Sequence, residues 1–246
     1  MQRVALFVAG LALAGALGVG GFLLFADDEE DRSKPRPRLA KEAPLGPLGL
    51  SAHVLPGRQV VLRARPGGQI VRRIGDTTEF GSPEALSPIS RRGNWFAVRH
   101  TSLGNRGVAW VDARSPQFKL RRRVVRLDVD LSERELSVFF GGRLARRIPV
   151  AVGAPETPTP PGEYYVTDKL RGADFGPFYG CCILALSGRQ PNLPRGWSGG
   201  DRLAIHGSPT PTWGHNVSNG CLHARVVDLR YLMRAVPLGT VVTIRA

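Results

Sequence analysis

Cysteine is scarce in this chain, and its pattern excludes two common ways of stabilising a small fold. The 246 residues include only Cys181, Cys182 and Cys221, too few for a disulfide-dense scaffold. No CxxC pair and no cysteine–histidine zinc spacing occurs, so we expect no metal and no other cofactor. Adjacent cysteines are poorly placed to bond to each other, and the odd count leaves at least one thiol free.

Aromatic and acidic residues are also in short supply. Aromatics make up 7% of the chain, against 30 glycines and 20 prolines, a balance that favours many turns and a β-rich protein. The hydrophobic share of 42% excludes wholesale disorder, and the lack of a triplet period excludes a collagen-like chain. Basic residues outnumber acidic ones by 34 to 20, a net charge of +14. This charge suits an anionic partner: nucleic acid, membrane headgroups or a wall polymer.

One long hydrophobic run is present, at the N-terminus. Residues 4–25 carry no charge and would span about 33 Å as a helix, enough for a bilayer core. Arg3 precedes the run and an acidic cluster follows it at 27–31, which favours an N-terminus inside and an exported remainder. We therefore expect a transmembrane anchor at 1–26 and a charged, proline-rich linker at 27–50. A cleaved signal peptide is the alternative.

Residues 51–118 alternate short β-rich runs with turn signals, which predicts a small antiparallel barrel. The stretches that carry this pattern are residues 62–67, 93–98 and 107–111. They resemble a bacterial SH3-like domain, a family whose members often accompany cell-wall enzymes. We expect Trp95 and Trp110 to be core aromatics. The basic run at 121–123 reads as a solvated segment between two domains.

Residues 124–246 predict a second β-rich unit with one helix. Period-two alternation favours strands at 125–131 and 135–140, with Gly141 and Gly142 as the hairpin turn before a returning strand at 144–152. Residues 157–166 read as a stiff loop that enters another strand, and 241–244 as a final strand. Apolar residues at helical spacing predict a helix over 224–236, the stripe being Val227, Leu229, Leu232, Met233 and Val236.

Cys221 is the candidate nucleophile, because it directly precedes this helical segment. A helix N-terminus stabilises a thiolate, and Gly220 would let a substrate approach the backbone without a Cβ in the way. The N–H groups of Gly220 and Cys221 would then hold a developing oxyanion. The alternative is a buried, inert thiol. These facts alone favour the two interpretations about equally.

A thiolate nucleophile needs a proton acceptor, and His206 is the best placed histidine. It ends an expected strand at 202–205 and is separated from Cys221 by a loop that would bring the two together. His215 lies in that loop and would flank the site, whereas His53 and His100 belong to the other unit. No GxSxG elbow and no phosphate-binding glycine loop competes for the assignment.

Residues 205–208 and 218–222 together resemble the signature of the L,D-transpeptidase catalytic domain. Three further segments support the resemblance: residues 128–132 with 136–138, residues 159–164, and residues 239–244. The resemblance covers 124–246 and implies a β-sandwich-type catalytic domain with one or more short helices. It implies that Cys221 attacks a peptidoglycan stem tetrapeptide and releases D-Ala. The resulting thioester is resolved by a diamino acid of a neighbouring stem, which gives a 3→3 cross-link.

The resemblance also implies roles for the residues around the nucleophile. His206 is the base, and Gly220, Asn219 and Ser218 form the oxyanion hole or shape the site, Ser218 through hydrogen bonds to the backbone. The residues expected to contact substrate are His223, Gly207 and His215.

Two positions depart from the family pattern: Asn219 stands where the family usually has His, and His223 where Arg or Asn is common. Asn cannot carry a proton at neutral pH, so activity should fall if that position titrates. His223 would weaken recognition of a substrate carboxylate, although it can still donate a hydrogen bond.

We therefore expect an extracytoplasmic enzyme of the cell envelope, anchored in the cytoplasmic membrane and inhibited by carbapenem-type β-lactams. Its partners would be the stem peptides and the membrane, not nucleic acid. Two alternatives stay open. The same thiol chemistry resolved by water would make an L,D-carboxypeptidase or a wall-peptide hydrolase, and a non-catalytic homologue would only bind the wall.

Overall fold

The computed structural model describes residues 42–45 and 49–246. Strands dominate these residues, beside one α-helix and three short 3-10 turns, so the expectation of a mainly β protein is confirmed. The anchor expected at 1–26 and most of the linker expected at 27–50 lie outside the described residues. Within 42–45 and 49–246, no helix is long and apolar enough to cross a membrane. The described residues belong to one compact unit.

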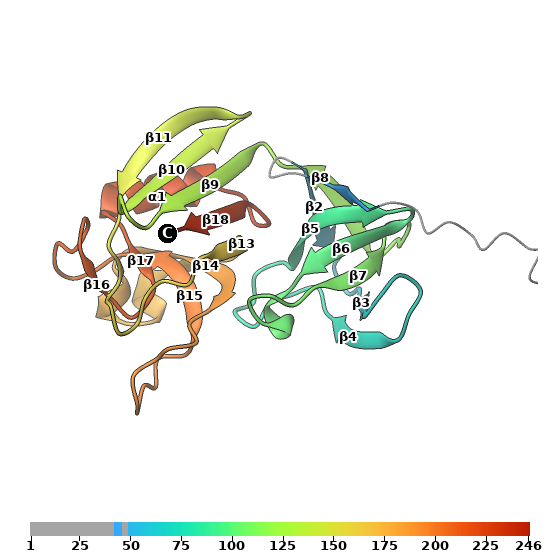
Figure 1. Cartoon of the computed structure of the whole chain (residues 1–246), viewed down its shortest axis with the longest axis horizontal. Helices are drawn as coiled ribbons and strands as arrows, with labels where there is room; N and C mark the ends of the chain where they lie inside the picture. Colours follow the sequence, from blue (N-terminus) through green and yellow to red (C-terminus); the bar gives the residue numbers. More distant parts are fainter. Residues whose placement is uncertain (1–41, 46–48) are drawn as a thin grey trace, which may run out of the picture. The chain divides into compact units, whose positions relative to one another are not determined.

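The N-terminal half forms an antiparallel sheet of eight strands (Figure 1). Its order is β4-β3-β7-β6-β5-β2-β8, and β1 pairs with β5. The strands are β1 (Ala43–Pro44), β2 (Leu50–Val54), β3 (Val60–Arg63), β4 (Ile70–Ile74), β5 (Ala85–Arg92), β6 (Trp95–Arg99), β7 (Ala109–Asp112) and β8 (Phe118–Arg122). The antiparallel pairing agrees with the sequence, whereas the SH3-like assignment stays a prediction.

The basic run at 121–123 agrees only in part with the solvated segment that the sequence suggested. Arg121 and Arg122 belong to β8, which pairs with β2. Arg123 is buried and donates to Ser87 Oγ at 2.5 Å and to the Pro88 carbonyl at 3.2 Å. Burial lowers the pKa of Arg123 to about 10. Arg121 and Arg122 are thus exposed, as predicted for a solvated run, whereas the sheet buries Arg123.

The C-terminal half forms a second sheet of eight strands, ordered β11-β10-β9-β18-β13-β14-β15-β17, and a two-stranded sheet of β12 and β16. The first strands are β9 (Val125–Asp130), β10 (Glu135–Phe140), β11 (Arg143–Pro149), β12 (Val152–Gly153) and β13 (Gly162–Arg171). The later ones are β14 (Cys182–Arg189), β15 (Arg202–His206), β16 (Asn216–Ser218), β17 (Leu222–His223) and β18 (Val241–Arg245).

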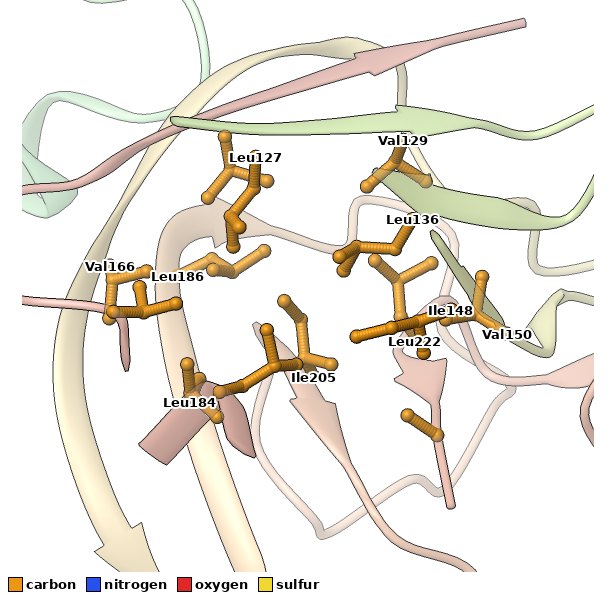
Figure 2. Close-up of a cluster of buried hydrophobic side chains, with 14 of the residues drawn as sticks. Leu127, Val129, Leu136, Ile148, Val150, Val166, Leu184, Leu186, Ile205 and Leu222 are labelled. Carbon is orange, nitrogen blue, oxygen red and sulfur yellow. The ribbon is translucent and has the colours of Figure 1, made fainter. Parts of the chain in front are cut away.

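Both ends of this sheet contribute to a single hydrophobic core. Leu127 and Leu136 from one end pack in the same cluster as Leu184, Ile205 and Leu222 from the other (Figure 2). Eight strands can share one core in this way only if the sheet curls back on itself. A curled sheet therefore replaces the β-sandwich that the sequence suggested.

The first hairpin of this sheet follows the sequence pattern closely. Alternate residues of β9 and β10, among them Leu127 and Leu136, are fully buried, as period-two alternation predicts. Gly141 and Gly142 both have positive φ, 52° and 85°, which the tight turn between β10 and β11 requires and which glycine adopts without steric cost.

The single α-helix, α1 (Val226–Ala235), packs its buried face on the core. It begins two residues later than expected because its N-cap, Arg225, has extended backbone angles. Val227, expected in the apolar stripe, is 61% exposed, whereas Leu229 and Leu232 are fully buried.

A buried ion-pair cluster fixes α1 to the sheet. Asp228 on α1 is fully buried, and its carboxylate accepts hydrogen bonds from Arg146 on β11 at 2.7 and 3.0 Å. Arg225 also donates to it at 3.0 Å. A buried carboxylate is tolerated only with such partners. The need to keep Asp228 paired with both arginines therefore fixes the position of α1 on the sheet.

We predict that Asp228→Asn lowers the free energy of unfolding by about 2 kcal/mol, since charge-assisted hydrogen bonds at a buried site are lost. Urea unfolding followed by circular dichroism measures the effect. Asp174→Asn, an exposed carboxylate in a 3-10 turn, is the matched control and should change the value by less than about 0.5 kcal/mol. Equal stability of the two variants would contradict the prediction.

Candidate active site

The parallel pairing of β15 with β17 brings the two halves of the site together. In this register Ile205 pairs with Leu222 and His206 with His223. Ile205 and Leu222 point into the hydrophobic core (Figure 2). Because side chains alternate along a strand, His206 and His223 lie on the opposite face, and so does Cys221, which precedes Leu222.

His206 is a buried, neutral imidazole with one nitrogen available as a base. It is 6% exposed, and its Nδ1 lies 2.6 Å from the Gly207 carbonyl. A carbonyl only accepts, so Nδ1 carries the proton and Nε2 keeps its lone pair. The ring packs between Tyr179 and His223, with centroid distances of 4.9 and 4.6 Å. Burial, and then the neighbouring His223, lowers the pKa of His206 to about 4.

Cys221 is the one free cysteine among the described residues, and it is partly exposed. Its Sγ donates a weak hydrogen bond to the Arg202 carbonyl at 3.8 Å. Burial of the sulfur raises the pKa of this thiol to about 11, although a backbone hydrogen bond from Ala204 acts in the other direction. The site therefore rests as a neutral thiol and a neutral imidazole on the same face of the sheet.

The helix N-terminus expected behind Cys221 is not there. The strand β17 and the cap residue Arg225 separate Cys221 from the first turn of α1. Since a helix N-terminus acts only over its first turn, α1 does not lower the pKa of the thiol. The reasoning from adjacency in the sequence was wrong because a short strand intervenes.

Every backbone carbonyl of the nucleophile loop, residues 218–221, accepts a hydrogen bond from a side chain. The pairs are Thr157 Oγ1 to Ser218 (2.9 Å), Gln190 Nε2 to Asn219 (3.1 Å), Thr159 Oγ1 to Gly220 (2.9 Å) and Ser218 Oγ to Cys221 (2.6 Å). In a trans peptide bond, the carbonyl of one residue and the N–H of the following residue point in opposite directions. The carbonyl of Gly220 therefore directs the N–H of Cys221 away from Thr159.

Gly220 differs from its expected role in two respects. Its N–H donates to Ser218 Oγ at 3.1 Å, so this N–H is engaged and does not supply an oxyanion donor. Its φ is +105°, and a Cβ built there would lie 2.1 Å from Gln190 Nε2. Glycine is thus needed for the backbone conformation and for the Gln190 amide, rather than for the approach of a substrate.

Gln190, which follows β14, was missed from the sequence. It is 4% exposed, and its Nε2 also donates to the carbonyls of Thr157 and Pro158 at 3.1 and 3.0 Å. Its Oε1 accepts the N–H of Asn192 at 3.0 Å. One buried amide therefore joins three loops behind the nucleophile. No local sequence signal marks such a residue, because the three carbonyls that its Nε2 binds are distant in the chain.

The other residues that the sequence assigned to the site differ in their burial and contacts. His223 lies on the face of the thiol, with Nδ1 3.1 Å from Thr212 Oγ1, and burial lowers its pKa. Asn219 and His215 are exposed. Gly207 donates its N–H to the Tyr179 carbonyl at 2.9 Å and packs on Gly180. Both backbone polar groups of Gly207 are thus engaged, and its carbonyl positions the His206 ring; its contact with a substrate stays a prediction.

Cys181 and Cys182 form a disulfide with each other, with Cα atoms 3.8 Å apart, contrary to the expectation from their adjacency. Cys181 ends a turn and Cys182 begins β14. The alternation that separates neighbouring side chains within a strand therefore does not apply to this pair. Within the described residues, no group of three or more histidine, cysteine or acidic side chains could hold a metal ion.

We predict that alkylation of Cys221 by iodoacetamide rises about tenfold per pH unit between pH 7 and pH 10, because the raised pKa of the thiol leaves little thiolate at neutral pH. Mass spectrometry of the Cys221 peptide gives the rate. A plateau that begins near pH 7 would indicate a preformed thiolate–imidazolium pair and contradict the neutral resting state.

We also predict that Gln190→Glu lowers the free energy of unfolding by about 2–3 kcal/mol, since a carboxylate cannot donate to the three carbonyls that face it. Thermal and urea unfolding measure the loss. Gln69→Glu, the same change at an exposed position, is the control and should be near neutral. A Gln190→Glu protein as stable as this control would show that the amide does not hold the loop.

The C-terminal half of the chain is similar to known proteins. Residues 125–244 match the family model described as the L,D-transpeptidase catalytic domain (YkuD). The YkuD protein of Bacillus subtilis strain 168 is 33% identical over 117 residues, and that of Bacillus licheniformis is 33% identical over 120. These matches cover 47% and 48% of this chain, and 63% and 64% of the relatives, less than two thirds of their length.

Solved structures of similar proteins include L,D-transpeptidase 3 of Mycobacterium tuberculosis with a faropenem-derived adduct. It has a TM-score of 0.41 at 20% identity and covers 56% of this chain and 73% of its own. Bdellovibrio bacteriovorus Bd1075 has a TM-score of 0.40 at 24% identity, with coverages of 50% and 48%. Residues 125–244, just under half of this chain, are thus similar to the L,D-transpeptidase catalytic domain.

Proposed function

We propose that this chain is a peptidoglycan L,D-transpeptidase that forms 3→3 cross-links through a thioester on Cys221. The observation that carries the proposal is the register of β15 and β17, which places the thiol and the imidazole on one face of the sheet. The unprotonated Nε2 of His206 is the acceptor that a neutral thiol requires. The family match supports the reaction class.

The proposed first half-reaction breaks one peptide bond. His206 Nε2 takes the thiol proton while the sulfur attacks the carbonyl between the third residue of the stem and its terminal D-Ala. The N–H of Cys221 donates to the developing oxyanion, because the bond from Thr159 to the preceding carbonyl aims it away from the loop interior. The imidazolium then returns its proton to the leaving amine, D-Ala departs, and a thioester remains.

The second half-reaction forms one peptide bond and restores the enzyme. The side-chain amine of a diamino acid on another stem attacks the thioester, and His206 takes the proton that the amine loses. The sulfur leaves and is reprotonated. One amide is broken and one is made, so no external energy source is needed.

The neutral resting pair makes proton transfer part of the attack. With the pKa of His206 near 4 and that of Cys221 near 11, the ion pair is disfavoured until a substrate carbonyl accepts the sulfur. Asn219 in place of the usual His fits this scheme, because its exposed side chain takes no part in the transfer.

We further propose that residues 4–25 anchor the chain in the cytoplasmic membrane, with the catalytic domain on the extracytoplasmic side. The exposed basic side chains of the N-terminal sheet suit an anionic wall polymer better than nucleic acid. They are Arg72, Arg73, Arg91, Lys119, Arg121 and Arg122. Carbapenem-type β-lactams would acylate Cys221, because their strained amide presents the same electrophile to the thiol.

The full chain, incubated with a purified disaccharide-tetrapeptide, should give a dimer that has lost one D-Ala, detected by mass spectrometry. Cys221→Ala should abolish the product, and His206→Gln should lower the rate about 10²–10⁴-fold because it removes the general base. His53→Gln, at a histidine on β2 of the N-terminal sheet, is the matched control and should retain activity.

Other products would change the assignment. Tripeptide with free D-Ala and no dimer would mean that water is the acceptor and would favour the carboxypeptidase. Turnover by the Cys221→Ala protein would overturn the site, and unchanged substrate with every variant would favour a wall-binding homologue.

A further inference from the structure

A pocket of about 310 Å³ lies on the face of the sheet that carries the thiol and the imidazole. Its floor includes Leu170, Ile183, Ala185 and Ala204. The strand register places these side chains in two cross-strand rows, Leu170–Ile183–His206 and Asp168–Ala185–Ala204. The first row thus ends at the base itself, and the pocket floor continues the face on which the reaction takes place.

One end of the pocket adjoins the catalytic pair. Arg202 and Ala204 line it, and these residues contact the Cys221 sulfur through a backbone carbonyl and a backbone N–H. Tyr179 also lines it, and its ring packs on His206. A ligand in the pocket therefore has its reacting end beside the thiol.

The other end is closed by residues of the segment between β4 and β5 of the N-terminal sheet. Phe80 and Glu79 line the pocket. The Phe80 ring lies 5.9 Å from that of Phe175 in an edge-to-face contact, and the Arg202 guanidinium lies 5.7 Å from its centre. Glu79 forms an ion pair with Arg202.

This segment is also tied to β13. Thr78 Oγ1 donates to the Asp168 carboxylate, which belongs to the second cross-strand row. The wall that Glu79 and Phe80 form is therefore attached to the same strand as the far edge of the pocket floor.

We propose that Glu79 and Phe80 form the binding site for the sugar-linked end of the donor stem peptide. The inference rests on the proposed function and extends it. From Cys221 at β17 to β13 are three strand spacings, about 14 Å. The three stem residues from the attacked carbonyl to the sugar linkage span about 10 Å when extended, so the group beyond them lies against Phe80.

The chemistry at this end suits a sugar. The apolar C–H face of a pyranose packs on aromatic rings, and Phe80 and Phe175 are 36% and 43% exposed. Hydroxyl and acetamido groups need hydrogen-bond partners, which Glu79, Arg189 and Asp201 supply at the rim. The N-terminal sheet would thereby select stems that are attached to glycan over free peptides.

The test measures binding to the full chain with Cys221→Ala, so that no ligand is consumed. The probes are the disaccharide-tetrapeptide and the same tetrapeptide without sugar. Adding Phe80→Ala should weaken binding of the first about tenfold, through loss of the ring face, and that of the second less than twofold. Phe140→Ala, at a 43% exposed phenylalanine on β10 outside the pocket, is the matched control. Phe80→Leu replaces Phe80→Ala if the latter unfolds.

Three results would overturn the inference: equal loss for both ligands, no loss with either Phe80 variant, or no binding of the disaccharide-tetrapeptide. Failure of the proposed function has a different signature. There the sugar-dependent effect of Phe80 would persist while the protein with its cysteine intact forms neither dimer nor tripeptide.

Discussion

The two-residue parallel pairing of β15 with β17 is the constraint on which the site depends. Its register buries Ile205 and Leu222 in the core. Because side chains alternate along a strand, His206, Cys221 and His223 must then lie on the opposite face of the sheet. A slip of one residue would send the base or the thiol into the core. The apolar packing that stabilises the sheet therefore also sets the geometry of the reacting groups.

Around this pairing, burial sets the protonation states of the two side chains, and hydrogen bonds fix the backbone of the loop that carries Cys221. Burial keeps both reacting groups neutral, with the pKa of His206 lowered and that of Cys221 raised. Hydrogen bonds from Thr157, Thr159 and Gln190 fix the backbone of the nucleophile loop. In the proposed reaction, this fixed loop would present the Cys221 N–H to the oxyanion, and charge would develop only when a substrate arrives.

Local patterns in the sequence predicted much of the C-terminal sheet. The β9–β10 hairpin, its Gly141–Gly142 turn and α1 follow from alternation, glycine and helical spacing. What failed depended on contacts between distant residues: the curl of the sheet, the strand between Cys221 and α1, and the Gln190 amide behind Gly220. A sequence motif was enough to propose His206 and Cys221 as a pair. The hydrogen bonds made by the backbone of Gly220 and Gly207 could be recognised only in the structure, because their partners depend on the packing.

The nitrogen chemical shifts of the His206 imidazole, followed by NMR from about pH 4 to pH 8, test the central claim most directly. We predict a neutral ring at pH 7 with its proton on Nδ1, and an Nε2 signal that shifts in the Cys221→Ala protein because the thiol lies on the same face of the sheet. An imidazolium at pH 7, a proton on Nε2, or an Nε2 signal that does not respond to loss of the thiol would contradict it.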